Sequence, residues 1–213
     1  MKKVILIIIL IIVLGGSGWY LWSKFQKSAS SPEEDLIMAT GKKIAMIIAF
    51  KDFQDQEYFN TKEVLENQGA EIVNFSASSG KAIGAYGGEV EVAKILDELE
   101  VKDFDAVVFI GGPGASNYID DSKCHRIAKE AILQDKILGA ICIAPAILAK
   151  AGVLHGKKAT VWTSLMDKSA AKILKENGAD YQDKDVVVDG KIITANGPAA
   201  AKKFGQAIAE VLK

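Results

Sequence analysis

Short apolar runs that alternate with helix-like segments restrict the fold of this chain more than any other feature. Residues 43–50, 106–110 and 136–141 are apolar runs of strand length, as is typical of strands buried on both faces of a sheet. Between them, residues 58–68 and 121–133 show helical spacing. Strand–helix alternation predicts an α/β fold, a mostly parallel sheet with helices on both faces.

Weaker patterns fill the remainder of the domain. The Gly- and Ser-rich stretch 76–88 predicts a loop, and the spacing of apolar residues in 93–99 predicts a helix. Asp189 and Gly190 separate two apolar runs, which predicts a β-hairpin with a type I′ turn. The other expected elements are strands at 71–75, 89–92, 186–189 and 191–194, and helices at 146–151 and 199–212.

The N-terminal end of the chain is apolar enough to cross a membrane. Residues 4–22 are long enough for a bilayer of roughly 30 Å, and Trp19, Tyr20 and Trp22 would lie at its far interface. A cleaved signal peptide is the alternative, because small residues occupy 15–18. No Ala-x-Ala cleavage site is present, so we predict an uncleaved membrane anchor over residues 1–22.

The charges that flank this segment predict its orientation. Lys2 and Lys3 precede the apolar run, and two further lysines follow it. The positive-inside bias keeps the N-terminus in the cytoplasm and places the domain outside it. Residues 23–41 include a small, polar and acidic stretch and are interpreted as a linker. The folded domain is expected at 42–213, which is one domain's worth of chain.

Charge and cysteine content exclude several functional classes. The chain has 26 basic and 27 acidic residues and a formal net charge of −1, which argues against nucleic acid as a partner. Its two cysteines make no disulfide framework, and no Cys/His cluster has zinc spacing, so neither a metal nor another cofactor is expected. A Cys124–Cys142 disulfide stays open for an extracytoplasmic domain.

One strand ends at a cysteine. The run 136–141 stops at Cys142, and Pro145 then opens a helix-like segment. A strand that turns sharply into a helix is typical of a nucleophile elbow. The helix N-terminus would favour the thiolate, which is the reactive form of cysteine. The alternative interpretation is a buried Cys142 that acts as a small hydrophobe.

Two other strand ends carry candidate chemistry. The glycine-rich segment 111–115 follows the strand at 106–110, and could direct a backbone N–H toward a developing oxyanion, with Ile143 N–H as second donor. An ordinary glycine-rich turn is the alternative. Glu57 follows the first strand. If Glu57 converges on Cys142, its carboxyl has a raised pKa and can donate a proton; otherwise it is a solvated or capping acid.

The order of these motifs resembles a known family. The segment 140–160 is similar to the core of the PfpI/ThiJ superfamily, which includes PfpI-type intracellular proteases, glyoxalase III-like enzymes and the parkinsonism-associated deglycase. Supporting motifs follow the family order at 53–57 (F-x-D-x-E), 111–112 (G-G), 177–181 (N-G-A-D-Y) and 186–194 (V-V-V-D-G-K-I-I-T). The resemblance implies a flavodoxin-like three-layer sandwich of the class I glutamine amidotransferase-like type.

The resemblance also implies roles for individual residues. Cys142 matches the reactive cysteine, and Glu57 matches the acid that hydrogen-bonds it. Gly112 and Ile143 match the positions that supply backbone amides. Gly111 is an accessory candidate. His125 is a second accessory candidate; the alternative is that it is a surface or packing residue. Cys124 is interpreted as a core residue of the same helix.

One departure from the family bears on activity. PfpI-type proteases carry His directly after the cysteine, where this chain has Ile143, and no His lies near Trp162, where the deglycase branch has one. The only histidines are His125 and His155, and His155 is expected in an exposed turn. Without a nearby imidazole, Cys142 lacks the base of a Cys-His dyad, which disfavours peptidase activity.

Two functional classes follow from these observations. In the first, the thiolate of Cys142 adds to a reactive carbonyl, either a small 2-oxoaldehyde or a modified protein, and water releases the product. In the second, the protein is a redox-sensing or chaperone-like stress protein, and Cys142 oxidises to a sulfinate that Glu57 stabilises. The superfamily resemblance further implies a homodimer.

Overall fold

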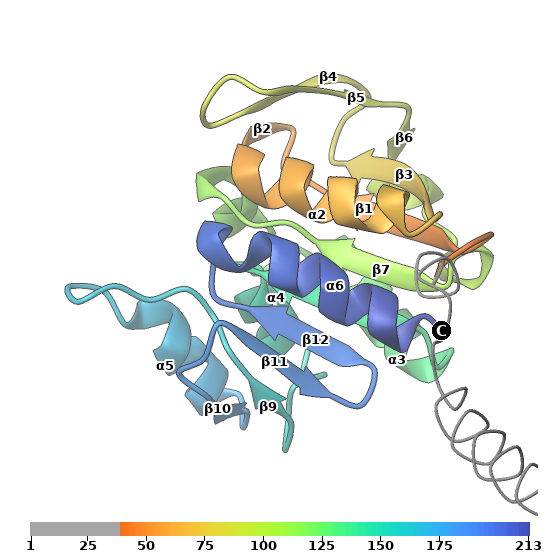
Figure 1. The fold of residues 1–213 in the computed structure, drawn as a ribbon. Coiled ribbons are helices and arrows are strands. Elements are labelled where there is room, and N and C mark those ends of the chain that lie inside the picture. Colours follow the sequence, from red (N-terminus) through yellow and green to blue (C-terminus); the bar gives the residue numbers. More distant parts are fainter. Residues whose placement is uncertain (1–38) are drawn as a thin grey trace, which may run out of the picture. The chain divides into compact units, whose positions relative to one another are not determined.

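The computed structural model describes residues 39–213, which fold around a seven-stranded sheet (Figure 1). All neighbouring strands are parallel except the antiparallel outer pair β11–β12. The central strands follow the flavodoxin-like order, in which the second strand along the chain lies outside the first. Across the sheet the strands are β11 (Val186–Asp189), β12 (Ile192–Ala195), β8 (Ile137–Ile141), β7 (Ala106–Phe109), β1 (Lys43–Ile47), β3 (Glu71–Ser76) and β6 (Lys94–Ile95).

Helices cover both faces of this sheet. The helices α2 (Asp55–Asn67) and α6 (Ala201–Val211) pack side by side on one face, and α3 (Ser122–Leu133) and α4 (Pro145–Lys150) lie on the other (Figure 1). The predicted three-layer α/β sandwich with a mostly parallel sheet is therefore confirmed. Next to the β11 edge lie α5 (Ser169–Glu176) and a small parallel pair, β9 (Lys158–Ala159) and β10 (Asp180–Tyr181).

A second sheet replaces the loop that was predicted for residues 76–88. It consists of β2 (Lys51–Phe53), β4 (Gly80–Gly84) and β5 (Glu89–Val92), with β4 and β5 forming a hairpin. The Asp55 carboxylate holds the hairpin tip, because it accepts hydrogen bonds from Tyr86 N at 2.9 Å and Gly88 N at 2.6 Å. The loop prediction was wrong because β4 pairs with the distant strand β2 as well as with its hairpin partner β5, and composition does not reveal such pairing.

The helix predicted at residues 93–99 was also wrong. This segment forms the edge strand β6, whose Lys94 pairs with Phe75, and then one 3-10 turn. The Glu98 side chain accepts a hydrogen bond from Ile95 N at 2.9 Å, which closes that turn. The 3-10 turns of the domain are η2 (Leu96–Glu98), η3 (Val101–Asp103), η4 (Pro113–Tyr118) and η5 (Pro198–Ala200).

Other local predictions match the structure. Asp121 caps α3, because its Oδ1 accepts from Lys123 N at 2.8 Å and from Cys124 N at 2.9 Å. The predicted hairpin around Gly190 joins β11 to β12, and this glycine has a φ of +60°. Gly139 allows α6 to pack closely against the sheet, since a Cβ at this position would lie 3.0 Å from Phe204 Cζ.

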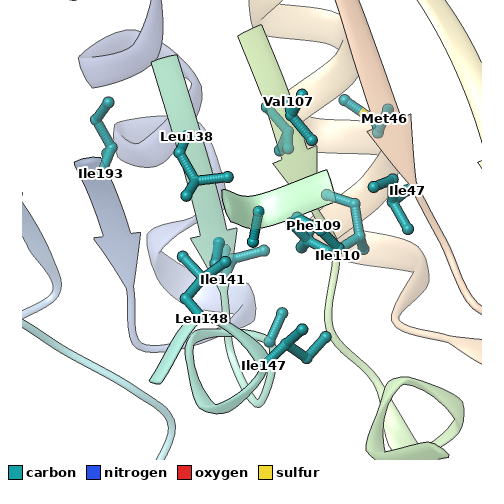
Figure 2. Close-up of a cluster of buried hydrophobic side chains, with 14 of the residues drawn as sticks. Met46, Ile47, Val107, Phe109, Ile110, Leu138, Ile141, Ile147, Leu148 and Ile193 are labelled. Carbon is teal, nitrogen blue, oxygen red and sulfur yellow. The ribbon is translucent and has the colours of Figure 1, made fainter. Parts of the chain in front are cut away.

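The core lies between the central strands and their covering helices. Its apolar side chains are buried, and each fully buried Val, Leu, Ile, Phe or Met contributes about 1.5–3 kcal/mol relative to an exposed position. This packing fixes the strand ends that carry the candidate chemistry. Figure 2 labels Met46, Ile47, Val107, Phe109, Ile110, Leu138, Ile141, Ile147, Leu148 and Ile193 in this cluster.

The predicted membrane anchor, residues 1–22, lies outside the described residues. Within residues 39–213 no helix is both long and apolar enough to cross a bilayer. Ala39 already belongs to the folded domain, since its side chain is buried and its N–H donates to Gln68 O at 2.9 Å. The domain thus includes residues slightly before position 42.

Candidate active site

The sheet brings three strand ends to one edge. In the register of the parallel strands, Ile47 lies opposite Phe109, and Phe109 lies opposite Ala140. The strands β7 and β8 end one or two residues before Gly111 and Cys142, so these two residues lie side by side. Glu57, in the first turn of α2, reaches the same place. Ligands of open α/β sheets bind at this carboxyl edge.

Cys142 occupies the predicted elbow between β8 and α4. Its φ of +63° is a left-handed conformation that few residues other than glycine adopt. Two backbone hydrogen bonds hold this conformation: Cys142 N donates to Ala195 O, and Trp162 N donates to Cys142 O, both at 2.9 Å. The thiol is half-buried and free. The elbow thus fixes the sulfur atom at the sheet edge.

Backbone amides surround the sulfur of Cys142. The N–H groups of Gly112 and Ile143 both hydrogen-bond to it, and each lowers the pKa of the thiol. These are the two backbone amides that were predicted as donors from the sequence. Donors fixed in the backbone stabilise a developing negative charge without having to reorganise.

Glu57 is the second ionisable group of the site. Its side chain is fully buried, and Oε2 accepts a hydrogen bond from Gly111 N at 3.1 Å. Its Oε1 is buried, and no group of residues 39–213 lies in ordinary hydrogen-bond geometry with it. Burial raises the pKa of Glu57 to about 8, although its interactions with Cys142 and Gly111 act in the opposite direction. At neutral pH this carboxyl therefore holds its proton.

The two acids form a coupled pair. Burial, followed by the charge of an ionised Glu57, raises the pKa of Cys142, contrary to the lowered pKa expected from the helix terminus. Two adjacent negative charges repel each other, so the pair carries at most a single charge over a wide range of pH. With Glu57 protonated, this repulsion is absent and the carboxyl can donate a hydrogen bond to the thiolate.

Gly111 separates the two acids because it lacks a side chain. A Cβ at Gly111 would lie 2.5 Å from Cys142 Cβ and 2.7 Å from Glu57 Oε2. Gly112 has a φ of +110°, and a Cβ there would meet the backbone of Gln54. The Gly-Gly pair thus permits the close approach of α2 to the elbow.

A cavity of about 490 Å³ opens above the sulfur. Aromatic and aliphatic side chains line most of it, and the polar groups are few. No lysine, arginine or histidine of the described domain contributes to its wall. Its residues include Gln54, Tyr86, Pro113, Ser116, Ile119, Cys142, Ile143, Trp162, Asp167, Ser169, Ile173 and Pro198.

Residues 42–211 match the DJ-1/PfpI family. The chain belongs to this family. An uncharacterized protein of Methanocaldococcus jannaschii is 40% identical over 172 residues, which cover 80% of this chain and 81% of that protein. A protein of Pyrococcus furiosus named deglycase PfpI is 28% identical, covering 79% of this chain and 98% of the relative.

Other members extend the comparison. A Caenorhabditis elegans protein named a glutathione-independent glyoxalase is 27% identical, covering 83% of this chain and 91% of the relative. The crystal structure of a ThiJ/PfpI domain protein from Brachyspira murdochii superposes with a TM-score of 0.77 at 31% identity, covering 81% of this chain and 97% of that one. These findings confirm the family and its flavodoxin-like fold.

In this DJ-1/PfpI domain, both histidines lie outside the cavity wall. His125 Nε2 lies 2.7 Å from Ile119 O, which ties α3 to the preceding turn, and His155 is exposed beside Gly178. The structure therefore gives the accessory candidate His125 a packing contact and does not place it on the cavity wall. Cys124 is fully buried in α3, and burial raises the pKa of its thiol.

Several residues of this DJ-1/PfpI site were not predicted. Gln54 stands three positions before Glu57 in the same motif, so its proximity to the acid could have indicated it. Tyr86 reaches the cavity through the β4–β5 hairpin, and Trp162 and Asp167 through the segment after β9. No local pattern marks these three, because long-range folding alone brings them to Cys142.

Proposed function

We propose that this protein converts reactive carbonyl compounds by hydrolytic chemistry of the glyoxalase or deglycase type. The observation that carries the proposal is that Cys142 and two backbone donors, Gly112 and Ile143, line one cavity, and that the buried acid Glu57 contacts Cys142 beneath it. The names of two relatives, a deglycase and a glyoxalase, support it. The substrate is either a small 2-oxoaldehyde or a carbonyl adduct on a protein.

The first step is addition of sulfur to the carbonyl carbon. In the singly ionised pair the thiol proton of Cys142 moves to the Glu57 carboxylate. The resulting thiolate forms the S–C bond, and the carbonyl π electrons move to oxygen. The amides of Gly112 and Ile143, which hold the charge on sulfur, lie next to the new oxyanion. Protonated Glu57 then transfers its proton to that oxygen, which gives a neutral hemithioacetal.

The second stage completes the conversion of a 2-oxoaldehyde. Glu57, now a carboxylate, removes the hydrogen of the former aldehyde carbon and returns a proton to the neighbouring carbon, which leaves a 2-hydroxy thioester. Water attacks the thioester, the C–S bond breaks, and the sulfur leaves as a thiol. Overall, one 2-oxoaldehyde and one water give one 2-hydroxy acid. No external oxidant, reductant or cofactor enters this balance.

The test is turnover of methylglyoxal to lactate by the purified full-length chain. Wild type should produce lactate, and Cys142→Ala should lose at least a hundredfold in kcat/KM, as expected for a nucleophile. Cys124→Ala is the matched control and should keep wild-type turnover, because Cys124 lies in the core of α3. Equal activity of Cys142→Ala and wild type would contradict the proposal.

A redox-sensing role is the second candidate. The same amides and Glu57 that stabilise a thiolate could hold the oxygens of a sulfinate on Cys142. This role predicts that mild peroxide adds two oxygen atoms to Cys142 and that methylglyoxal is not consumed. Intact-mass spectrometry of wild type and Cys142→Ala, run alongside the lactate assay, distinguishes the two candidates.

Peptidase activity is disfavoured by the position after the nucleophile. Ile143 stands where a dyad histidine would be needed, and neither histidine of the chain lines the cavity. An amide leaving group needs a proton from a general acid, and Glu57 alone would have to supply it. Hydrolysis of casein by wild type, lost in Cys142→Ala, would contradict this assignment.

We further propose that residues 1–22 anchor the protein, with the domain outside the cytoplasm. The length of the apolar segment 4–22 and the lysines before it support this proposal. Protease treatment of intact cells should then digest the domain, and protection until lysis would contradict the orientation. A homodimer stays a prediction, which analytical ultracentrifugation of the full-length chain in detergent can test.

A further inference from the structure

Gln54 lines the same cavity as Cys142 and makes a set of hydrogen bonds that fixes its orientation. It is the N-cap of α2 and is half-buried beside Gly112. Its backbone N–H donates to Gly111 O at 3.0 Å, and its backbone carbonyl accepts from Tyr58 N at 3.1 Å. The residue is therefore held from both sides.

The side-chain amide of Gln54 is only partly used. Its Oε1 accepts a hydrogen bond from Gln56 N at 2.9 Å, as an N-cap oxygen does. This bond assigns the two ends of the amide, because a backbone N–H needs an acceptor. The remaining end, Nε2, carries two N–H groups, and neither has a partner within residues 39–213.

A donor without a protein partner at the wall of the cavity is available to hydrogen-bond a substrate oxygen. A carbonyl held over Cys142 needs donors on its oxygen as negative charge develops there. Gly112 and Ile143 supply backbone N–H groups at the sulfur, and Gln54 lines the same cavity. A neutral amide donates without placing another negative charge beside Glu57, as a carboxylate would.

We propose that Gln54 is a substrate-binding residue whose Nε2 donates a hydrogen bond to the oxygen of the carbonyl attacked by Cys142. This inference rests on the proposed function, since it assigns a donor for the same substrate. The side-chain amide of Gln54 would then recognise the carbonyl together with the backbone amides of Gly112 and Ile143.

Two substitutions separate the donor from the other duties of Gln54. Gln54→Glu keeps an acceptor for Gln56 N but replaces the donor with a charge. Gln54→Met is neutral but loses both the donor and the cap. A capping role alone would impair only the methionine variant, and a charge effect alone would impair only the glutamate variant. Loss in both variants identifies the donor. Gln56→Glu, an exposed position in the same helix turn, controls for added charge.

The first measurement is kcat/KM for methylglyoxal with the full-length chain. Both Gln54 variants should lose about tenfold, the effect of one hydrogen bond to a partly exposed oxygen. Gln56→Glu should stay within about twofold of wild type. Wild-type activity in either Gln54 variant would overturn the proposal.

The second measurement does not depend on turnover. The rate of Cys142 alkylation is compared for iodoacetamide, which has a carbonyl, and iodoethane, which has none. A change in thiolate content alters both rates equally, so their ratio reports the contact with the carbonyl. The ratio should fall about fivefold in both Gln54 variants. If wild type does not consume methylglyoxal, the proposed function fails, and an unchanged ratio would then also overturn the role of Gln54.

Discussion

The two cysteines of this domain differ in environment more than in acidity. Burial raises the pKa of both thiols, and in each case a nearby acid raises it further: Asp121 for Cys124 and Glu57 for Cys142. Only Cys142 has backbone amides directed at its sulfur and a cavity above it. Access and fixed donors, rather than a low pKa, thus distinguish Cys142, the proposed nucleophile, from the packing residue Cys124.

Alkylation rates should give the largest contrast between the two cysteines. Cys124 is fully buried in α3, so it reacts only after local unfolding, whereas Cys142 lines the cavity. A local opening of about 4 kcal/mol would slow Cys124 roughly a thousandfold relative to Cys142. Mass spectrometry of native protein treated with iodoacetamide measures both rates. In denaturant the two rates should converge, and faster native labelling of Cys124 would show that Cys142 is not the more accessible thiol.

The buried acid beside Cys142 should make stability depend on pH. The pKa of Glu57 rises from 4.5 to about 8 in the folded domain. Its contribution to stability is therefore fully present below pH 4.5 and is lost as pH rises through about 8. The change is on the order of 4 kcal/mol for a shift of this size.

Glu57→Gln should remove this dependence. Urea unfolding between pH 4.5 and pH 8 should show wild type losing stability relative to the variant as pH rises, because glutamine does not titrate. Asp121→Asn, which changes the acid beside Cys124, is the matched control. If the free energies of unfolding of wild type and Glu57→Gln changed with pH in parallel, the Glu57 carboxyl would not be held neutral.

Substitution of Gly111 tests the geometry between the two acids. In Gly111→Ala the new methyl group would lie 2.5 Å from Cys142 Cβ, so the elbow and α2 must move apart. A displacement near 1 Å at a reacting group can reduce turnover about a hundredfold. The lactate assay measures it. Gly152→Ala is the control, since a Cβ there meets open space; it should affect stability alone.

The smallest effect is expected at the packing cysteine. Cys124→Ala removes one buried sulfur atom from α3 and leaves a small void, so it should reduce the free energy of unfolding by about 1 kcal/mol. Chemical unfolding measures this loss. Iodoacetamide should still label Cys142 at the wild-type rate; a change of more than a few-fold would mean that the two cysteines are coupled through β8 and α3.

The sequence predicted the parts of the fold that depend on local pattern. Buried apolar runs mark the central strands, Asp121 marks the start of α3, and Gly190 marks the hairpin. The convergence of Cys142, Glu57 and the glycines was also expected, because parallel strands end at one edge and the motif order matched a family. These predictions needed no knowledge of distant contacts.

The parts that depend on long-range contacts were not predictable. The strand β4 has a glycine at each end and exists because β2 and β5 pair with it. Tyr86 and Trp162 reach the cavity from segments whose sequence carries no sign of it. The raised pKa of Cys142 depends on its burial next to Glu57, whereas the sequence suggested only the helix end.

The left-handed conformation of Cys142 limits which side chains the elbow can accept. At a φ of +63°, a β-branched residue would clash with its own backbone, so threonine is excluded as an alternative nucleophile. Glycine would fit this conformation best, yet it has no reacting group. Under the proposed function, the domain accepts a less stable backbone at the position of its nucleophile, which is a trade of stability for activity.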